Sequence, residues 1–104
     1  MKTVAVNLRS EAHDIYIGRP RAGDAWTFGN PFIVGRDGVQ GECVALFQRW
    51  LAGEDMLAVS PDATDARRKW MLEHLHLLKG KKLGCFCKPR ACHGDVLAAL
   101  ANAL

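Results

Sequence analysis

The sequence predicts a single α/β domain with a mixed β-sheet of three to four strands, flanked by about three helices. Short apolar segments typical of strands lie near both ends of the chain, and segments with helical apolar spacing lie between and after them. A chain of 104 residues, 49% of them hydrophobic, can form one core without disulfide bonds or a structural metal. The expected order is β-β-(β)-α-α-β-α, in which the bracketed strand is optional.

Residues 2–8 (KTVAVNL) and 14–18 (DIYIG) are the first two expected strands, because their apolar and β-branched residues alternate. The segment between them, RSEAH, is too short for a crossover helix, so we expect the two strands to be antiparallel neighbours. Residues 19–32 are rich in Gly, Pro and Asn and are expected to form a loop. The optional strand is FIVG, residues 32–35.

Two helices are expected in the middle of the chain. The first covers residues 42–51, where apolar residues such as Cys43 and Trp50 recur at helical spacing. The second covers residues 62–79, with Ser60 as the N-cap. The expected apolar stripe of this second helix consists of Ala66, Trp70, Met71, Leu75 and Leu78.

The C-terminal part predicts a strand over residues 82–87 and a helix over residues 92–104. Helices precede and follow this strand, so we expect it inside the sheet. The side chains expected in the core are Leu83, Phe86, Val96, Leu97, Leu100 and Leu104.

Composition limits the classes of function. The net charge of +3 is too small to indicate nucleic-acid binding and is compatible with an anionic ligand. We find no pattern of a signal peptide or a membrane span, and therefore expect a cytoplasmic protein with reduced cysteines. Cys85 and Cys87 would lie on one face of a strand, a poor geometry for a disulfide. Cys43 is expected to be a small buried apolar residue.

The stretch GCFCKPRACHGDVL, residues 84–97, is the first candidate site. It joins the last strand to the start of the last helix, where free N–H groups can bind an anion. Lys88 and Arg90 flank this helix start, and no Ser, Thr, Asp or Asn stands at the expected cap position. Asp95 would repel an anion if it pointed inward.

The loop after residues 14–18 is the second candidate site. Arg19 follows Gly18 and suits a phosphate or carboxylate, Trp26 offers a stacking surface, and Asn30 offers an amide. If the strands over residues 14–18 and 82–87 are parallel neighbours, both loops open at the same sheet edge. The two candidate sites would then form one pocket.

The motifs YIGR (16–19), GNPF (29–32) and C-x-C-x-P-x-x-C-H-x-D (85–95) follow one another in this order. In this respect the chain resembles the domain of unknown function 4326 family of small phage and bacterial proteins. The resemblance implies the fold and the place of the site, and leaves the reaction open. It points to Gly18, Arg19, Asn30, Pro31, Phe32, Cys85, Cys87, Pro89, Cys92, His93 and Asp95.

The cysteine-rich stretch has two possible interpretations, a reactive thiol and a zinc site. Cys92 between Arg90 and His93 at a helix N-terminus is expected to have a lowered pKa, which suits a nucleophile, and His93 is the preferred acid–base candidate. The alternative is a zinc site of Cys85, Cys87, Cys92 and His93. The spacing C-x-C-x4-C-H is unlike that of common zinc sites, so we expect no bound metal or other cofactor.

The functional hypothesis is a domain that binds a nucleotide or nucleotide-derived anion between loop 18–32 and the segment 85–95. Whether it also cleaves a glycosidic or phosphate bond of that ligand, and is an enzyme, stays open. The alternative is a zinc-stabilised module that recruits nucleic acid or protein. The basic runs RRK (67–69) and KGKK (79–82) support nucleic-acid binding only weakly, because no aromatic residues alternate with them.

Overall fold

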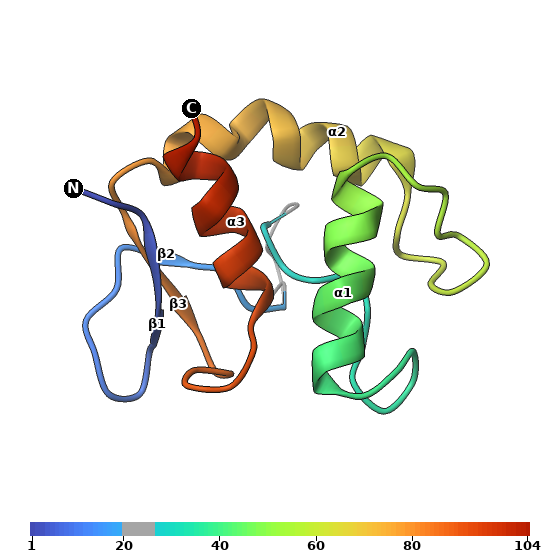
Figure 1. Cartoon of the computed structure of the whole chain (residues 1–104), viewed down its shortest axis with the longest axis horizontal. Helices are drawn as coiled ribbons and strands as arrows, with labels where there is room; N and C mark the ends of the chain where they lie inside the picture. Colours follow the sequence, from blue (N-terminus) through green and yellow to red (C-terminus); the bar gives the residue numbers. More distant parts are fainter. Residues whose placement is uncertain (20–26) are drawn as a thin grey trace.

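A computed structural model describes residues 1–19 and 27–104 of the chain. Its sheet has three parallel strands in the order β1-β3-β2, with β1 at Val4–Asn7, β2 at Ile15–Tyr16 and β3 at Lys82–Cys85 (Figure 1). In β3, Leu83, Gly84 and Cys85 are all buried, as is usual for a central strand. The α/β class, the element order β-β-α-α-β-α and the inner position of the last strand are confirmed.

The prediction that the first two strands are antiparallel neighbours is wrong, and the described strands form a parallel rather than a mixed sheet. β3 inserts between β1 and β2, and the segment joining these two strands passes over it. A Cβ atom on Gly84 would lie 2.5 Å from the His13 ring, so the glycine leaves room for this crossing. The optional strand at residues 32–35 is absent from the described residues, where Val34 makes only a bridge to Gly38.

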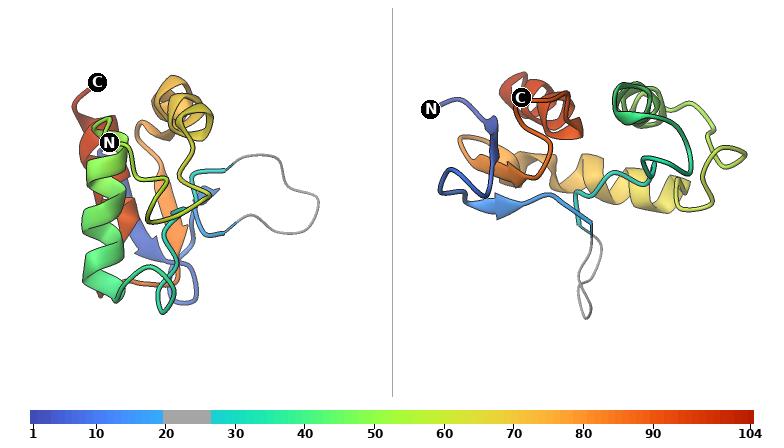
Figure 2. Two further views of the ribbon diagram at one scale, coloured as in Figure 1. Left: turned by 90° about the vertical axis from the view of Figure 1, so that its right-hand side faces the viewer. Right: turned by 90° about the horizontal axis from the view of Figure 1, so that it is seen from below.

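Of the three α-helices in the described residues, two lie on one side of the sheet, and the third lies at one end of it (Figures 1 and 2). α3 (His93–Asn102) packs on β1 and β3, and α1 (Gln40–Leu51) packs against α3. α2 (Asp65–His74) runs across the ends of α1 and α3, and both chain termini lie on the same side of the molecule (Figures 1 and 2). No helix in the described part of the chain is long and apolar enough to cross a membrane.

The second helix is shorter than expected. It begins at Asp65, where Thr64 accepts a hydrogen bond from the backbone N–H of Arg67, and it continues into η1, a 3-10 helix at Leu75–Leu78. The prediction of Ser60 as its N-cap is wrong. The Ser60 hydroxyl is buried and donates to the carbonyl of Pro31 at 2.9 Å, so it anchors the preceding loop instead.

The core agrees in part with the predicted set. Leu83 and Leu97 are fully buried, Val96 is half-buried, and Cys43 is buried in α1 as expected. The prediction that Phe86 and Leu100 are core residues is wrong, because their exposed fractions are 46% and 37%. Leu83 and Cys85 share one face of β3, so the alternation of side chains directs Phe86 to the opposite face. Of the other predicted core residues, Ala66 and Leu104 are also exposed.

Candidate functional site

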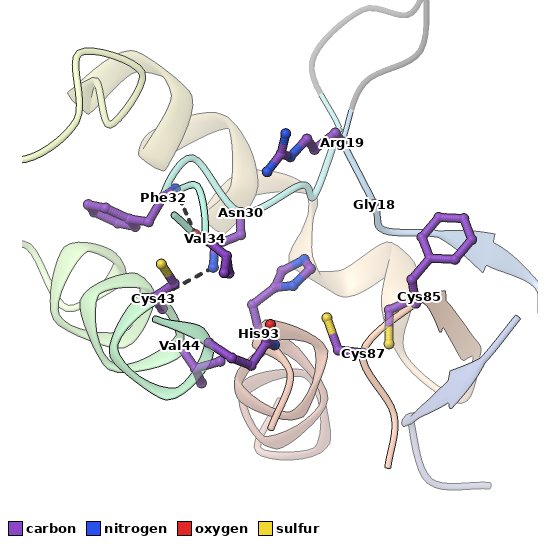
Figure 3. A pocket seen from close by; sticks show the side chains of 12 residues that line it. Gly18, Arg19, Asn30, Phe32, Val34, Cys43, Val44, Cys85, Cys87 and His93 are labelled. Carbon is purple, nitrogen blue, oxygen red and sulfur yellow. Dashed lines mark hydrogen bonds between the residues drawn. The ribbon is translucent and has the colours of Figure 1, made fainter. Parts of the chain in front are cut away.

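A pocket of about 260 Å³ lies where β2 and β3 end. The two strands are parallel and pair Tyr16 with Gly84, so their carboxyl ends meet at one edge of the sheet. The pocket is lined from five places in the chain (Figure 3). The segment after β2 contributes Gly18 and Arg19, and the following loop contributes Asn30, Phe32 and Val34. The remaining lining residues are Gln40, Cys43 and Val44 of α1, Cys85, Phe86 and Cys87 at the end of β3, and His93 of α3.

Arg19 is exposed, and its side chain points across the pocket mouth in Figure 3. It makes no hydrogen bond or ion pair with residues 1–19 or 27–104. Arg19 and Asn30 also line a neighbouring pocket of about 340 Å³, together with Asp62 and Arg67. The two pockets therefore share one arginine and one amide side chain.

Arg67 was missed at the sequence level, where the run RRK was considered only as weak support for nucleic-acid binding. Its Nη2 donates to the carbonyl of Gly29 at 2.9 Å, and its Nε is buried without a partner in the described structure. Burial lowers the pKa of Arg67, and Asp62 partly offsets this effect. Helical spacing could have indicated its inward orientation, because Arg67 precedes Trp70 and Met71 by three and four residues.

Asn30 lines the pocket with a side chain that already has protein partners. Its Nδ2 donates to the carbonyl of Cys43 in α1 at 3.2 Å, and its Oδ1 accepts from the backbone N–H of Phe32 at 3.0 Å. These two bonds fasten the loop to α1 and shape the pocket wall. A direct contact of Asn30 with a base or sugar stays a prediction.

His93 is a buried residue that joins three segments. Its Nε2 lies 2.9 Å from the carbonyl oxygen of Ile17 and 3.0 Å from that of Phe28. Both partners are acceptors, so Nε2 carries the hydrogen and the neutral ring has Nδ1 as its acceptor. Burial lowers the pKa of His93, and the two carbonyls oppose this. The structure gives His93 a positioning role; its acid–base role stays a prediction.

Cys92 is the N-cap of α3. Its Sγ accepts from the backbone N–H of Gly94 at 3.3 Å, so the expectation of an uncapped helix start is wrong. The same Sγ lies 3.0 Å from Sγ of Cys85. Contact with Cys85, contact with Cys87 and burial raise the pKa of Cys92. The predicted lowering of this pKa is therefore wrong, because the helix terminus is outweighed by two neighbouring sulfurs.

Three of the predicted ligand-binding residues do not line this pocket. Lys88 and Asp95 form an ion pair at 3.2 Å, and Arg90 is exposed in the turn beside them. The pairing neutralises the acidic side chain that was expected to oppose an anion. Trp26 lies outside the described residues.

The cysteines and histidine of the zinc alternative are close in space but poorly directed for a metal. Nε2 of His93 faces two carbonyl oxygens, and its Nδ1 is 3.9 Å from Sγ of Cys92. Over residues 1–19 and 27–104, no group of three or more His, Cys, Asp or Glu side chains is arranged to hold a metal ion. The structure thus lends no support to zinc at Cys85, Cys87, Cys92 and His93.

Fold and site together define a small α/β domain whose parallel sheet opens at its carboxyl edge onto a pocket. The chain belongs to the family described as Domain of unknown function (DUF4326), which matches residues 3–103. A protein of Enterobacteria phage T4, "Uncharacterized 12.4 kDa protein in nrdA-td intergenic region", is 55% identical over 31 residues. That match covers 30% of this chain and 29% of the phage protein. No solved structure matches the chain.

Proposed function

We propose that the protein binds a small nucleotide-derived anion in the pocket between the end of β2 and the start of α3. The observation that carries this proposal is the pair of arginines between the two adjoining pockets. Arg19 has no partner among the described residues, and Arg67 keeps a buried Nε without one. An anion bound here would supply charge-assisted hydrogen bonds to both guanidinium groups.

The lining of the first pocket favours a ligand with a flat apolar part. Phe32, Val34 and Phe86 contribute apolar surface, and the last two are about half exposed, so a ring could cover them. The second pocket is more polar in its residues, with Asp62 and Arg67. A nucleotide combines both properties: its base suits the first pocket, and its phosphate suits Arg19 at the boundary.

Titration calorimetry with AMP, ADP, adenosine and inorganic phosphate tests the proposal. We expect AMP or ADP to bind more tightly than adenosine or phosphate alone. Arg19→Ala should weaken nucleotide binding about 10-fold or more, because a hydrogen bond to a charged group contributes about 1.5–3 kcal/mol. Chromatography of the recovered ligand detects any cleavage of its glycosidic or phosphate bond.

The matched control is Arg49→Ala, since Arg49 is an exposed arginine of α1 that pairs with Glu54 and lines neither pocket. This variant should bind nucleotide like the original protein. The proposal is abandoned if no nucleotide binds at millimolar concentration, or if the two arginine variants lose affinity equally.

A further inference from the structure

The second pocket, beside the proposed nucleotide site, has charged and apolar lining groups of its own. Its volume is about 340 Å³, and it shares Arg19 and Asn30 with the first pocket, of about 260 Å³. Both polar atoms of the Asn30 side chain have protein partners, so this residue forms a fixed wall where the two pockets adjoin (Figure 3). A ligand that fills the first pocket and extends past Arg19 therefore enters the second.

Arg67 gives the second pocket a guanidinium group from α2. Its Nη2 donates to the carbonyl of Gly29 at 2.9 Å, which fixes the position of the group. Most of its N–H donors, the buried Nε among them, have no acceptor among the described residues. Arg19 adds a second guanidinium group at the boundary between the pockets. Two neighbouring arginines suit a diphosphate that is esterified at both ends, because each of its phosphates carries one negative charge.

Asp62 gives the same pocket a hydrogen-bond acceptor. Its Oδ2 accepts from Nη2 of Arg36 at 3.2 Å, and its Oδ1 accepts no hydrogen bond from residues 1–19 or 27–104. The side chain is 49% exposed, so the carboxylate is accessible to a ligand. A carboxylate repels a phosphate, whereas it accepts hydrogen bonds from hydroxyl groups.

Pro31 and Ile33 supply the apolar part of this lining. A sugar ring has C–H groups on its faces and hydroxyl groups at its edge, so it can lie against both side chains and donate to Asp62. A further phosphate in the same place has no apolar face and would lie beside a carboxylate. The second pocket is therefore suited to a sugar that follows a diphosphate.

We propose that the ligand of this site is a nucleoside diphosphate sugar. The base lies in the first pocket, the diphosphate pairs with Arg19 and Arg67, and the hydroxyl groups of the sugar donate to Asp62. Asp62 is then the residue that distinguishes a nucleotide sugar from a nucleoside triphosphate. This inference rests on the proposed function, because it needs the nucleoside in the first pocket.

Titration calorimetry of the intact protein with ADP, ATP and ADP-ribose tests the inference, because these ligands share the adenosine diphosphate part. We expect ADP-ribose to bind about 10-fold more tightly than ADP, since its terminal hydroxyl groups gain hydrogen bonds to a charged acceptor. ATP should bind no more tightly than ADP, because its third phosphate approaches the carboxylate of Asp62.

The variant Asp62→Ala removes the acceptor and should reduce the preference for ADP-ribose over ADP to less than about threefold. Glu54→Ala is the matched control. Glu54 is 46% exposed and also pairs with an arginine, but it lines neither of these pockets. This control should keep the preference of the original protein.

Several outcomes would overturn the inference. If ADP binds and ADP-ribose binds no more tightly, the second pocket holds no sugar, while the proposed function stands. If ATP binds more tightly than ADP-ribose, the second pocket holds a phosphate instead. Both results are read on the unsubstituted protein, so they hold even if a variant fails to fold.

The variants and the whole panel give two more contradicting results. If Asp62→Ala and Glu54→Ala change the preference equally, Asp62 does not contact the sugar. If none of the three ligands binds at millimolar concentration, the proposed function fails, and this inference fails with it.

Discussion

The imidazole of His93 connects the end of β2, the loop at Phe28 and the start of α3 through a single nitrogen. At the sequence level this residue was an acid–base candidate because it follows Cys92 at a helix start. Its carbonyl partners are 76 and 65 residues away in the sequence, so neither could be identified from the motif. Because His93 is buried and hydrogen-bonded, its protonation couples the stability of the protein to pH.

We expect the free energy of unfolding to fall as the pH decreases from about 7 to 5. Burial lowers the folded-state pKa of His93 below its ordinary value of 6.5, so the unfolded chain binds this proton more readily. The contribution of neutral His93 is thus complete above pH 6.5 and is lost as the pH falls toward the folded-state pKa. Urea denaturation at several pH values measures this slope.

The variant His93→Gln should be less stable at pH 7 and should show a smaller slope between pH 7 and 5. His76→Gln is the control, because His76 is exposed in η1, and its profile should match that of the original protein. An identical slope in His93→Gln and the original protein would contradict the assignment.

Among the elements, α3 is the one whose position determines the site. It brings His93 to the pocket and places Cys92 in the core beside Cys85, and its first turn approaches the sheet closely at Gly94. A Cβ atom on Gly94 would lie 2.6 Å from Cδ1 of Ile17 and 3.0 Å from Cβ of Ala5. Ile17 is fully buried and has little room to move.

Gly94→Ala should therefore destabilise the protein by about 1–3 kcal/mol, because overpacking a dense core forces side chains and backbone apart. Gly41→Ala is the matched control in α1, where nothing lies within 4 Å of the added Cβ. That change should stabilise the protein by about 0.5–1 kcal/mol, because alanine is the better helix former. Chemical denaturation of both variants checks the prediction, and a neutral Gly94→Ala would show that α3 can move away from the sheet.

At the scale of the whole molecule, the two ends of the chain are joined. Thr3 is buried before β1, and its backbone N–H donates to Oδ1 of Asn102 at the end of α3 at 2.8 Å. The Thr3 hydroxyl donates to the carbonyl of Leu78 at 2.7 Å and accepts from the N–H of Gly80 at 2.9 Å. One residue thus links the first strand, the 3-10 helix and the last helix.

Thr3→Val should lower the free energy of unfolding by about 1–3 kcal/mol, because it removes both hydrogen bonds of the buried hydroxyl and leaves the N–H of Gly80 without this partner. Thr3→Ser keeps the hydroxyl and should retain most of the stability. A shift of the urea midpoint without a change in slope is the expected result. Equal stability of the Val and Ser variants would mean that the hydroxyl does not hold these elements together.

The sequence by itself determined the fold class, the order of the elements and the regions that form the pocket. These follow from local periodicity, from glycines and prolines, and from the rule that ligands bind beyond the carboxyl ends of parallel strands. Accordingly, Gly18, Arg19, Asn30 and His93 were named in advance, and all four line the pocket.

Only the tertiary structure decided the strand order, the inward orientation of Arg67 and the burial of the cysteines. β3 separates the first two strands, although residues 17–81 lie between it and β2 in the chain, and no local sequence pattern indicates that insertion. The sequence pointed to Cys92 as the reactive thiol, whereas in the structure Cys92 is fully buried and its Sγ lies 3.0 Å from Sγ of Cys85. Hydrogen-bond partners and burial depend on residues far away in the chain, and these determine the pKa of a side chain.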